Sequence, residues 1–387
     1  MDAYKFLDVI EDLGGDFFAG VPDSLLCPFI DAVADRYGFS GRHIVAANEG
    51  AAVGLAAGHY LAASSPAVVY MQNSGLGNAV NPICSLLHEK VCSIPVIFVI
   101  GWRGEPGTCD EPQHVFQGEI TLPLLDCLEI PYTVLTAADN DLSRVSEEFR
   151  GHIKNGRSVA FVISKGALTN DKKLVYASDA KLSREDALTT ILELAGGTAG
   201  FSTDGGATSG DAVYVCTTGK LSREVFEIRE WQGAGHGSDF LTVGAMGHSL
   251  MIAHGIALAK PERRVFCLDG DGSVLMHMGS LAVAGTSGPK NLFHVVINNG
   301  AHETVGGFPT AGKELNFADV ARTLGYRKVL RVSAMQDLES VMDALKNAQG
   351  PVFIEVICNL FSRSDLGRPT TTPERNKDEL MANLGDK

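Results

Sequence analysis

The chain has 387 residues, of which 45% are hydrophobic and 20% are charged, so it is long enough to form two globular domains of moderate size. Its formal net charge of −14 argues against a general nucleic-acid-binding protein, which would present a basic face. Residues 1–17 place acids among their apolar positions, which is unlike a signal peptide, and no stretch approaches the ~20 apolar residues of a membrane span. We therefore expect a cytoplasmic protein that binds neither nucleic acid nor membranes.

Short runs rich in valine and isoleucine alternate with helix-like segments along the whole chain. In the first half, buried strands are predicted at 66–71, 94–102 and 158–164. Residues 49–63 predict a helix whose small residues recur every three or four positions, a spacing that suits close helix packing. The second half repeats the pattern, with predicted strands at 212–216, 263–272, 291–299 and 351–358 and predicted helices at 248–259 and 334–348. This alternation predicts an α/β protein with two doubly wound parallel sheets.

A polar segment at 169–183 separates the two halves and is predicted to be a linker. The first domain would then span 1–168 and the second 184–368. Residues 369–387 are predicted to form a C-terminal tail, a loop followed by a short helix.

The eight cysteines are scattered along the chain without a CxxC pair or a zinc-finger spacing. Most of them lie in apolar runs, where cysteine behaves as a small hydrophobic residue. We therefore expect reduced thiols in the protein core, as in a cytosolic protein. The positions are Cys27, Cys84, Cys92, Cys109, Cys127, Cys216, Cys267 and Cys358.

Polar turns follow two consecutive predicted strands of the second half. Asp271 follows the apolar part of the first of these strands, 263–268, and Asn299 follows that of the second, 291–297. The carboxyl ends of parallel strands meet at one edge of a sheet, where such folds bind ligands. A carboxylate and an amide oxygen beside glycines suit a Mg²⁺ ion that also holds a diphosphate. Either motif alone would indicate an ordinary strand-end turn, but the pair at this spacing predicts the metal site.

Other metal and nucleotide motifs do not fit the sequence. The segment at 269–273 lacks the glycine and glutamate that a calcium loop needs, since Val274 and Ser280 stand at those positions. Residues 307–314 have P-loop spacing, but they do not follow a strand and lack the hydroxyl residue after the lysine. Residues 75–80 lack the last glycine of the dinucleotide-binding fingerprint.

Several segments together resemble the thiamine diphosphate-dependent decarboxylases. The paired turns "GDGS" and "INNGA" resemble the family's diphosphate and Mg²⁺ motif, "NEGAAVGLAAGHYLA" (48–62) its glutamate-bearing helix, and "VGAMGHS" (243–249) its cofactor-shaping loop. The resemblance covers nearly the whole chain, but there is no room for the middle domain of the larger members. It therefore implies a short form with one pyrimidine-binding and one diphosphate-binding domain. Residues 100–118, 216–224 and 298–307 resemble the phosphonopyruvate decarboxylases within the family, with the sulfopyruvate decarboxylases as the alternative.

The resemblance implies roles for particular residues. The Mg²⁺ ligands would be Asp271, Asn299 and the backbone oxygen of Ala301. Glu49 would hydrogen-bond the pyrimidine ring and favour its imino tautomer, which brings a base to the acidic thiazolium carbon. The remaining cofactor contacts would come from Thr218, Gly219, Gly244, Met246, Gly247, Gly272 and Ser273, with Met246 holding the cofactor in its bent form. Glu49 alone could instead be a helix N-terminal acid that favours the helix dipole.

The substrate pocket must hold a carboxylate and a phosphonate. Arg103 is the first candidate, because a planar guanidinium grips two oxygens. His114, Lys220 and His302 are further candidates, and His302 could also handle protons after decarboxylation. For each of these four, a structural or surface role remains open. Ser24 either caps a helix or reaches the substrate, and its sequence context favours capping.

The function implied is decarboxylation of 3-phosphonopyruvate to phosphonoacetaldehyde and CO₂, by a homo-oligomer whose active sites lie at a subunit interface. Decarboxylation of another 2-keto acid and carboligation remain open, because they differ from it only in the substrate or in what meets the intermediate. A regulatory protein that binds the cofactor without catalysis is the alternative outside enzymes. The retention of Glu49 together with Asp271 and Asn299 favours an enzyme.

Overall fold

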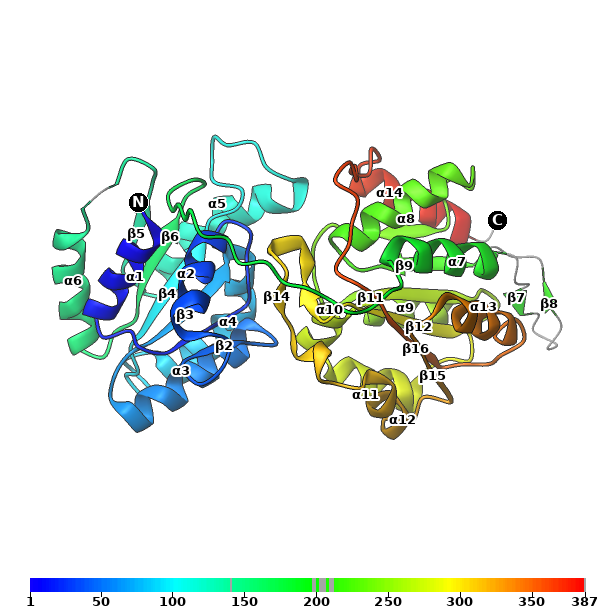
Figure 1. The fold of residues 1–387 in the computed structure, drawn as a ribbon, viewed down its shortest axis with the longest axis horizontal. Coiled ribbons are helices and arrows are strands. Elements are labelled where there is room, and N and C mark those ends of the chain that lie inside the picture. The colour runs from blue at the N-terminus through cyan, green and yellow to red at the C-terminus, as the bar shows by residue number, and fades with distance from the viewer. Residues whose placement is uncertain (140, 197–199, 202–206, 209–211, 386–387) are drawn as a thin grey trace. The chain divides into compact units, whose positions relative to one another are not determined.

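The computed structural model describes residues 1–139, 141–196, 200–201, 207–208 and 212–385, and it divides into two compact units (Figure 1). Unit 1 comprises Met1–Val175 with Val305–Phe308, and unit 2 comprises Tyr176–Thr304 with Pro309–Lys387. The boundary at Val175 falls inside the segment 169–183. The domain limits at 168, 184 and 368 stay a prediction.

Unit 1 is built on a six-stranded parallel sheet with the strand order β2-β1-β3-β4-β6-β5. Its strands are β1 (Phe18–Gly20), β2 (His43–Val45), β3 (Ala67–Gln72), β4 (Val96–Gly101), β5 (Tyr132–Leu135) and β6 (Val159–Ile163). Its helices are α1 (Ala3–Asp12), α2 (Cys27–Tyr37), α3 (Glu49–Ala63), α4 (Leu76–Pro82), α5 (Pro112–Cys127) and α6 (Ser143–Lys154), with short η1 (Asn73–Gly75) and η2 (Ile83–Leu87) turns beside α4.

Both faces of this sheet are covered, which explains why its strands are continuously apolar. One face packs against α3, α4 and α5 through a core of small and aliphatic side chains such as Ala52, Ala56 and Leu125. On the other face, aromatic rings meet edge to face, with Phe6 of α1 against Phe161 of β6 at a centroid distance of 5.2 Å. These two cores fix the strands whose carboxyl ends carry the polar loops.

Unit 2 contains a second six-stranded parallel sheet, with the order β10-β9-β11-β12-β16-β15. These strands are β9 (Val213–Cys216), β10 (Asp239–Leu241), β11 (Val265–Gly270), β12 (Leu292–Asn298), β15 (Lys328–Val332) and β16 (Val352–Ile357). The helices are α7 (Arg184–Gly196), α8 (Lys220–Trp231), α9 (Ser249–Ala259), α10 (Asp271–Met276), α11 (Gly279–Ser287), α12 (Phe317–Thr323), α13 (Met335–Ala344) and α14 (Pro373–Leu384). Short elements complete the chain: β7 (Gly200–Phe201), β8 (Ala207–Thr208), β13 (Ala301–His302), η3 (Glu303–Val305), β14 (Phe308–Pro309) and η4 (Ala311–Lys313).

Helices cover both faces of the second sheet as well (Figure 1). Alternate residues of β11 serve the two cores. Phe266 and Leu268 face α7, α8 and α13, whereas Val265 and Cys267 face α9, α11 and α12. The predicted α/β class with two parallel sheets is confirmed, and every strand and helix predicted above is found, with small shifts at its ends.

The C-terminal tail is part of unit 2 rather than an appendage to it. Leu380 of α14 enters the core beneath β9 and β11, and Asn376 is 4% exposed. The Asn376 side chain accepts a hydrogen bond from the Leu241 N–H at 3.0 Å and donates one to the Asp239 oxygen at 2.8 Å. The predicted short helix is confirmed, but the tail packs against the sheet.

The prediction of core thiols is wrong for half of the cysteines. All eight are free, and Cys216, Cys267 and Cys358 are buried. The exposed cysteines lie at helix ends and in loops, where sequence hydropathy does not report which side faces solvent; they are Cys84, Cys92, Cys109 and Cys127.

Among the described residues, no helix combines the length and the apolar character needed to cross a bilayer.

Candidate active site

The two polar turns of unit 2 lie side by side at the carboxyl end of its sheet. Strands β11 and β12 are hydrogen-bonded neighbours, with Gly270 opposite Ile297. Asp271 is the first residue of α10, and Asn299 directly follows β12. The Asp271 carboxylate accepts hydrogen bonds from the N–H groups of Asn299 and Gly272. The structure therefore brings together the two side chains that the sequence paired.

Asp271 is a buried carboxylate, only 3% exposed. Burial raises the pKa of Asp271 to about 6, although the hydroxyl of Thr310 donates a hydrogen bond to Oδ2 and opposes the shift. No ion pair of Asp271 is found in the part of the chain that the structure describes. A buried anion without a basic partner is costly, and a cation bound beside it would remove that cost. Its oxygen donors suit the hard ion Mg²⁺.

Asn299 is held in one orientation by a neighbouring acid. Its Nδ2 donates to Oε2 of Glu303 at 3.0 Å, and its Oδ1 accepts from the Ala301 N–H at 3.2 Å. Because a carboxylate only accepts, Glu303 fixes which end of the amide carries the oxygen. That oxygen keeps a second lone pair for a metal ion. The backbone oxygen of Ala301 is the third predicted ligand.

Glu303 is itself the centre of an ion-pair network that the sequence did not reveal. Its carboxylate also accepts from Arg184 and, at 3.0 Å, from Lys220. Burial alone would raise the pKa of Glu303, but these two cations outweigh it and lower the pKa. Lys220, a predicted substrate residue, thus neutralises Glu303 and contacts Ser362 at 2.7 Å. In the sequence, the feature that could have indicated this network is Glu303 itself, an acidic residue four positions after Asn299.

A returning loop closes over Asp271. A Cβ atom on Gly312 would lie 2.8 Å from Oδ2 of Asp271, so only glycine fits there. Asn298 holds this loop, since its Nδ2 donates to the Gly312 oxygen at 3.0 Å and to Glu355 at 2.9 Å. Thr310 and Asn298 are therefore site residues that sequence reasoning missed, although Asn298 is half of the asparagine pair.

The glycine-rich turn at 270–273 meets the loop at 244–247. Ser273 accepts hydrogen bonds at 3.0 Å from both the Gly247 N–H and the Thr217 hydroxyl. Gly247 has φ of 87°, and Ala245 has φ of 53°, so this loop holds a conformation that side chains rarely adopt. The Ser273 hydroxyl ties the loop to the first turn of α10.

Three predicted cofactor and catalytic residues converge at this turn. A Cβ atom on Gly272 would lie 2.8 Å from the His302 ring and 3.3 Å from the Met246 methyl group. This cradle of backbone between two side chains fits a diphosphate that approaches the N–H groups at the start of α10. Burial lowers the pKa of His302 to about 4, so its ring is neutral at pH 7 and can either donate or accept a proton.

The remaining predicted cofactor residues line the same region of unit 2. Thr218 donates its hydroxyl hydrogen to the Val243 oxygen at 2.8 Å, which leaves its backbone as the group available to a ligand. Gly219 precedes α8 with φ of 97°, and a side chain there would strain the turn. Gly244 lies beside them in the loop that carries Met246.

In unit 1, Glu49 is the first residue of α3 and is 5% exposed. The Asn48 side chain caps the helix by accepting from the Ala51 N–H at 2.8 Å. Asn78 donates to Oε2 of Glu49 at 2.8 Å. A Cβ atom on Gly75 would lie 2.5 Å from Oε1, so the carboxylate occupies a space that any larger residue would fill. Glu49 is therefore a fixed, buried acid, whereas a simple helix-dipole acid would be exposed.

Three of the predicted substrate residues form one network with Asp110 in unit 1. Arg103, in the loop after β4, forms an ion pair with Asp110 and donates to the Ser24 hydroxyl at 3.0 Å. His114 of α5 contacts the same Asp110 at 2.9 Å. Burial would raise the pKa of Asp110, but the Arg103 and His114 hydrogen bonds outweigh it and hold the pKa well below its usual range. The other two candidates, Lys220 and His302, belong to unit 2.

The helix-capping interpretation of Ser24 is wrong. Helix α2 begins at Cys27, its N-cap position is Leu26, and no side chain caps it. The Ser24 hydroxyl instead accepts from Arg103. A proline follows Cys27 in the first turn of the helix, a position that proline favours. The helix therefore begins later in the chain than a cap at Ser24 would require.

Asp23 is a further candidate that the sequence did not single out. It follows β1, is fully buried, and its Oδ1 has no hydrogen-bond partner among the described residues. Burial raises the pKa of Asp23 to about 6, and the nearby Arg103 opposes the shift. The feature of the sequence that could have indicated Asp23 is its position in "GVPDS", shortly after the end of strand β1.

Comparison with known proteins identifies the two halves of the chain. The thiamine pyrophosphate enzyme N-terminal TPP binding domain matches residues 3–125, and the C-terminal TPP binding domain matches residues 217–356. The phosphonopyruvate decarboxylase of Streptomyces viridochromogenes is 34% identical, over 93% of this chain and 89% of its own. That of Streptomyces hygroscopicus is 32% identical, over 96% and 91%.

A more distant relative is the sulfopyruvate decarboxylase of Methanosarcina acetivorans, which is 24% identical over 96% of this chain and 95% of its own. The matched N- and C-terminal domains identify thiamine diphosphate as the cofactor. The chain therefore belongs to the thiamine pyrophosphate enzymes, in the group of two-domain decarboxylases that includes the phosphonopyruvate decarboxylases.

Proposed function

We propose that this protein decarboxylates 3-phosphonopyruvate to phosphonoacetaldehyde and CO₂, using thiamine diphosphate and Mg²⁺. The observation that carries the proposal is the buried Asp271, bridged to Asn299 at the sheet edge and lacking a basic partner among the described residues. Its relatives in Streptomyces support the substrate, because they are phosphonopyruvate decarboxylases at 32–34% identity along almost the entire chain.

The residues around Asp271 suit the proposed cofactor. Asp271, Asn299 and the Ala301 oxygen would hold Mg²⁺, and the N–H groups of Gly272 and Ser273 would approach the diphosphate. When bound, thiamine diphosphate supplies a carbon nucleophile and a cationic ring that accepts the electrons released with CO₂. Met246, beside Gly272, would support the bent shape of the cofactor.

Two acids and a neutral histidine account for the protein's part in the chemistry. Glu49, fixed by Asn78 and Gly75, would hydrogen-bond the pyrimidine ring and favour its basic tautomer. His302 is neutral at pH 7, so it can deliver a proton after CO₂ has left. Asp23, whose pKa burial raises to about 6, is a second proton carrier on the side of Arg103.

The anion pocket would form around Arg103. Its guanidinium is paired with Asp110 but also reaches Ser24, so it is held with its remaining N–H groups in a defined direction. His114 shares Asp110 and could turn its free ring nitrogen to the phosphonate. A phosphonate with up to two negative charges then gains charge-assisted hydrogen bonds that pyruvate cannot make.

The test is a decarboxylation assay with purified protein, thiamine diphosphate and Mg²⁺. With 3-phosphonopyruvate, sulfopyruvate and pyruvate as substrates, CO₂ and aldehyde are measured separately. We expect kcat/KM for phosphonopyruvate to exceed that for pyruvate by roughly a thousandfold, the effect of two lost charged contacts. A preference for sulfopyruvate would move the assignment to the sister activity. CO₂ without free aldehyde would indicate carboligation, and cofactor binding without CO₂ a regulatory protein.

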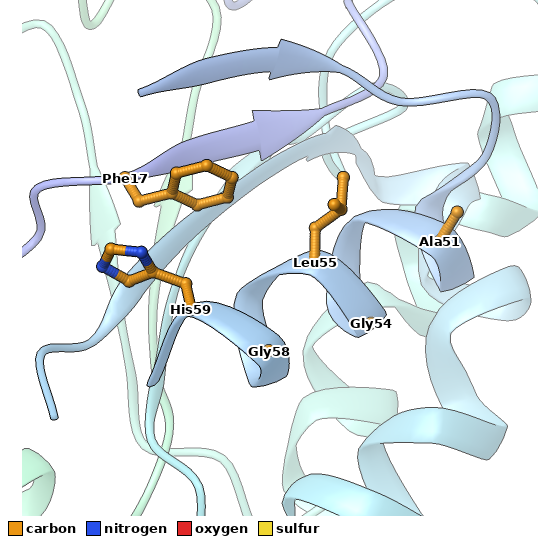
Figure 2. Close-up of a pocket in the computed structure, with 6 residues that line it drawn as sticks. All are labelled: Phe17, Ala51, Gly54, Leu55, Gly58 and His59. Atoms are coloured by element: carbon orange, nitrogen blue, oxygen red, sulfur yellow. The ribbon is translucent and has the colours of Figure 1, made fainter. Parts of the chain in front are cut away.

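We also propose that the enzyme is a homo-oligomer, with the exposed face of α3 as part of the contact between copies. A Cβ atom added to Gly54 or Gly58 would meet no heavy atom within 4 Å, and Leu61 is 73% exposed. Figure 2 shows Gly54, Leu55, Gly58 and His59 along the helix, with the Phe17 ring next to the ring of His59. The two rings are stacked with centroids 4.8 Å apart, and all these residues line an apolar pocket of about 680 Å³. The small residues thus find no helix to pack against within the described part of this chain.

The same helix carries Glu49 at its start, so a second copy seated on this face would lie close to the pyrimidine acid. Leu61→Glu should shift the sedimentation of the protein toward the monomer and weaken cofactor binding. An unchanged sedimentation coefficient would exclude this face from the contact.

The eight free thiols suit a reducing compartment, and we place the enzyme in the cytoplasm.

A further inference from the structure

A second cluster of metal-binding side chains lies inside unit 2. Cys267 and Asp269 of β11 and His294 of β12 offer a sulfur, a carboxylate oxygen and a ring nitrogen that all lie within 4.8 Å of one another. Cys267 and His294 are direct neighbours across the two strands. The three residues are 0%, 1% and 0% exposed, respectively. The cluster thus occupies the dry core of the sheet, two residues before Asp271.

The His294 ring is oriented toward the other two members. Its Nδ1 lies 3.3 Å from the hydroxyl of Tyr326, while its Nε2 lies 3.4 Å from Oδ2 of Asp269. This buried Nε2 makes no hydrogen bond within the described part of the chain. When Nδ1 donates its hydrogen to Tyr326, the lone pair of Nε2 faces a carboxylate. In that tautomer two electron-rich atoms face each other in a dry core, and a positive charge between them would stabilise the arrangement.

We propose that Cys267, Asp269 and His294 together bind one divalent transition-metal ion of the zinc type. A thiolate, a carboxylate and a neutral imidazole are the ligands that such ions prefer, whereas Mg²⁺ disfavours sulfur. With the ion, the two anionic ligands give a neutral site, which suits complete burial. A tetrahedral ion holds its ligands about 3.5 Å apart, so small side-chain rotations close the cluster, and a water molecule takes the fourth position.

One feature of the surroundings agrees with a metal site, and another sets the proton balance of binding. Tyr326 bonds the second ring nitrogen of His294, and metal-ligating histidines commonly have such a partner, which fixes their orientation. Burial and the nearby Asp269 hold the pKa of the Cys267 thiol well above its usual range, so the free cluster carries a protonated thiol. Binding therefore replaces the S–H bond by a sulfur–metal bond and releases one proton to solvent.

The ion would join β11 to β12 directly behind the turns that carry Asp271 and Asn299. Its role would be to hold the two strand ends at the spacing that the Mg²⁺ site requires. This role is separate from the decarboxylase proposal, because the cluster can be assayed without thiamine diphosphate or substrate.

The test is titration of the chelator-treated protein with Co²⁺, a zinc substitute whose absorption reports its ligands. We expect one equivalent per chain, an intense sulfur-to-cobalt band in the near ultraviolet, and displacement by Zn²⁺ but not by excess Mg²⁺. Cys267→Ser should abolish the band, and His294→Gln should weaken Co²⁺ binding by about 100-fold while retaining the thiol. Circular dichroism would establish that both variants are folded.

Cys216→Ser is the matched control, because Cys216 is equally buried in the same sheet but faces the opposite core. It should keep the full cobalt band. A band that survives in Cys267→Ser would come from the exposed thiols and would overturn the proposal. Absence of stoichiometric binding to the wild-type protein would also overturn it, leaving His294 and Asp269 as a buried contact at 3.4 Å without a metal ion.

Discussion

The two sheets of this molecule have the same strand order but different chemistry at the ends of corresponding strands. In unit 1, Asn73 follows the third strand of the order and Arg103 follows the fourth; in unit 2, Asp271 and Asn299 occupy these places. In both units the first residue bridges to the backbone of the second. Asn73 accepts from the Arg103 N–H at 3.1 Å and donates to its oxygen at 2.8 Å, whereas Asp271 accepts from the Asn299 N–H.

The difference between these two side chains explains why we expect unit 1 to bind the anionic group of the substrate and unit 2 to bind a cation. An amide satisfies both backbone groups and adds no charge, so the guanidinium of Arg103, which pairs with Asp110 and Ser24, keeps its remaining N–H groups for an anion. A carboxylate in the same place accepts the N–H but leaves a buried negative charge, which calls for a cation. Under the proposed function, one topology would thus supply an anion-binding edge in unit 1 and a cation-binding edge in unit 2.

The largest effect is expected from Glu49, the proposed catalytic acid of unit 1. Glu49→Gln should keep thiamine diphosphate binding in calorimetry but lower kcat by roughly 10³-fold, because an amide cannot favour the basic pyrimidine tautomer. Deuterium exchange at the thiazolium carbon should slow in parallel. Exchange at the wild-type rate would make Glu49 a structural acid, no different from other buried residues of α3.

The corresponding acid of unit 2 should act on binding instead. Asp271→Asn gives unit 2 the residue type of unit 1, and we expect Mg²⁺-dependent cofactor affinity to fall by about 100-fold or more, since the anionic ligand is lost. Calorimetric titration with Mg²⁺ and thiamine diphosphate measures it. The reverse change in unit 1, Asn73→Asp, should leave Mg²⁺ affinity unaltered, and equal losses in both variants would break the comparison.

Arg103→Ala tests the anion-binding edge. Turnover of phosphonopyruvate should fall by about 100-fold in kcat/KM, the effect of losing one charged hydrogen-bonded contact, while residual turnover of pyruvate changes little. Both substrates are measured on both proteins. Equal losses for the two acids would mean that Arg103 holds the loop through Asp110 rather than the phosphonate.

Glu303→Gln should have a smaller effect on the cation-binding edge. Without the charge, the amide of Asn299 is oriented less strongly, and we expect Mn²⁺ affinity, measured by electron paramagnetic resonance, to fall by roughly 10-fold. Glu227→Gln is the matched control, because Glu227 also pairs with an arginine but does not contact Asn299. A loss of affinity in the control variant would point to a general effect of surface charge.

The smallest effect concerns a buried histidine of unit 1. Burial lowers the pKa of His43 to about 4, while Gly38 and Tyr70 hold its neutral ring. The unfolded state therefore binds more protons between pH 6.5 and 4, and this part of the stability is present above pH 6.5 and lost as the pH falls. The cost at pH 5.5 is about 1 kcal/mol relative to pH 7.

Urea denaturation at the two pH values measures this effect, and His43→Gln serves as the variant without the titrating ring. The variant should lose less stability on acidification than the wild type. If both proteins lose the same amount, the carboxylates rather than His43 set the acid sensitivity of unit 1.

The sequence predicted those features of the structure that depend on a single continuous segment of the chain. Runs of β-branched residues predict the buried strands, and the strand-end rule places Asp271 beside Asn299 because both turns follow neighbouring parallel strands. The supports of the site were not predictable in this way. Thr310 reaches Asp271 across 39 positions, and Arg184 reaches Glu303 across 119. Such contacts depend on how loops return, which hydrophobic periodicity does not encode.

The side chain of Asn376 has a consequence for the edge of the second sheet. Strand β10 is an edge strand of the second sheet. The free N–H and C=O groups of an unprotected edge strand can pair with a strand of another molecule. By bonding one N–H and one oxygen of β10 at the same time, the amide of Asn376 takes the place that a foreign strand would occupy. The C-terminal helix is thereby a guard against aggregation, and a chain shortened before it should lose solubility ahead of activity.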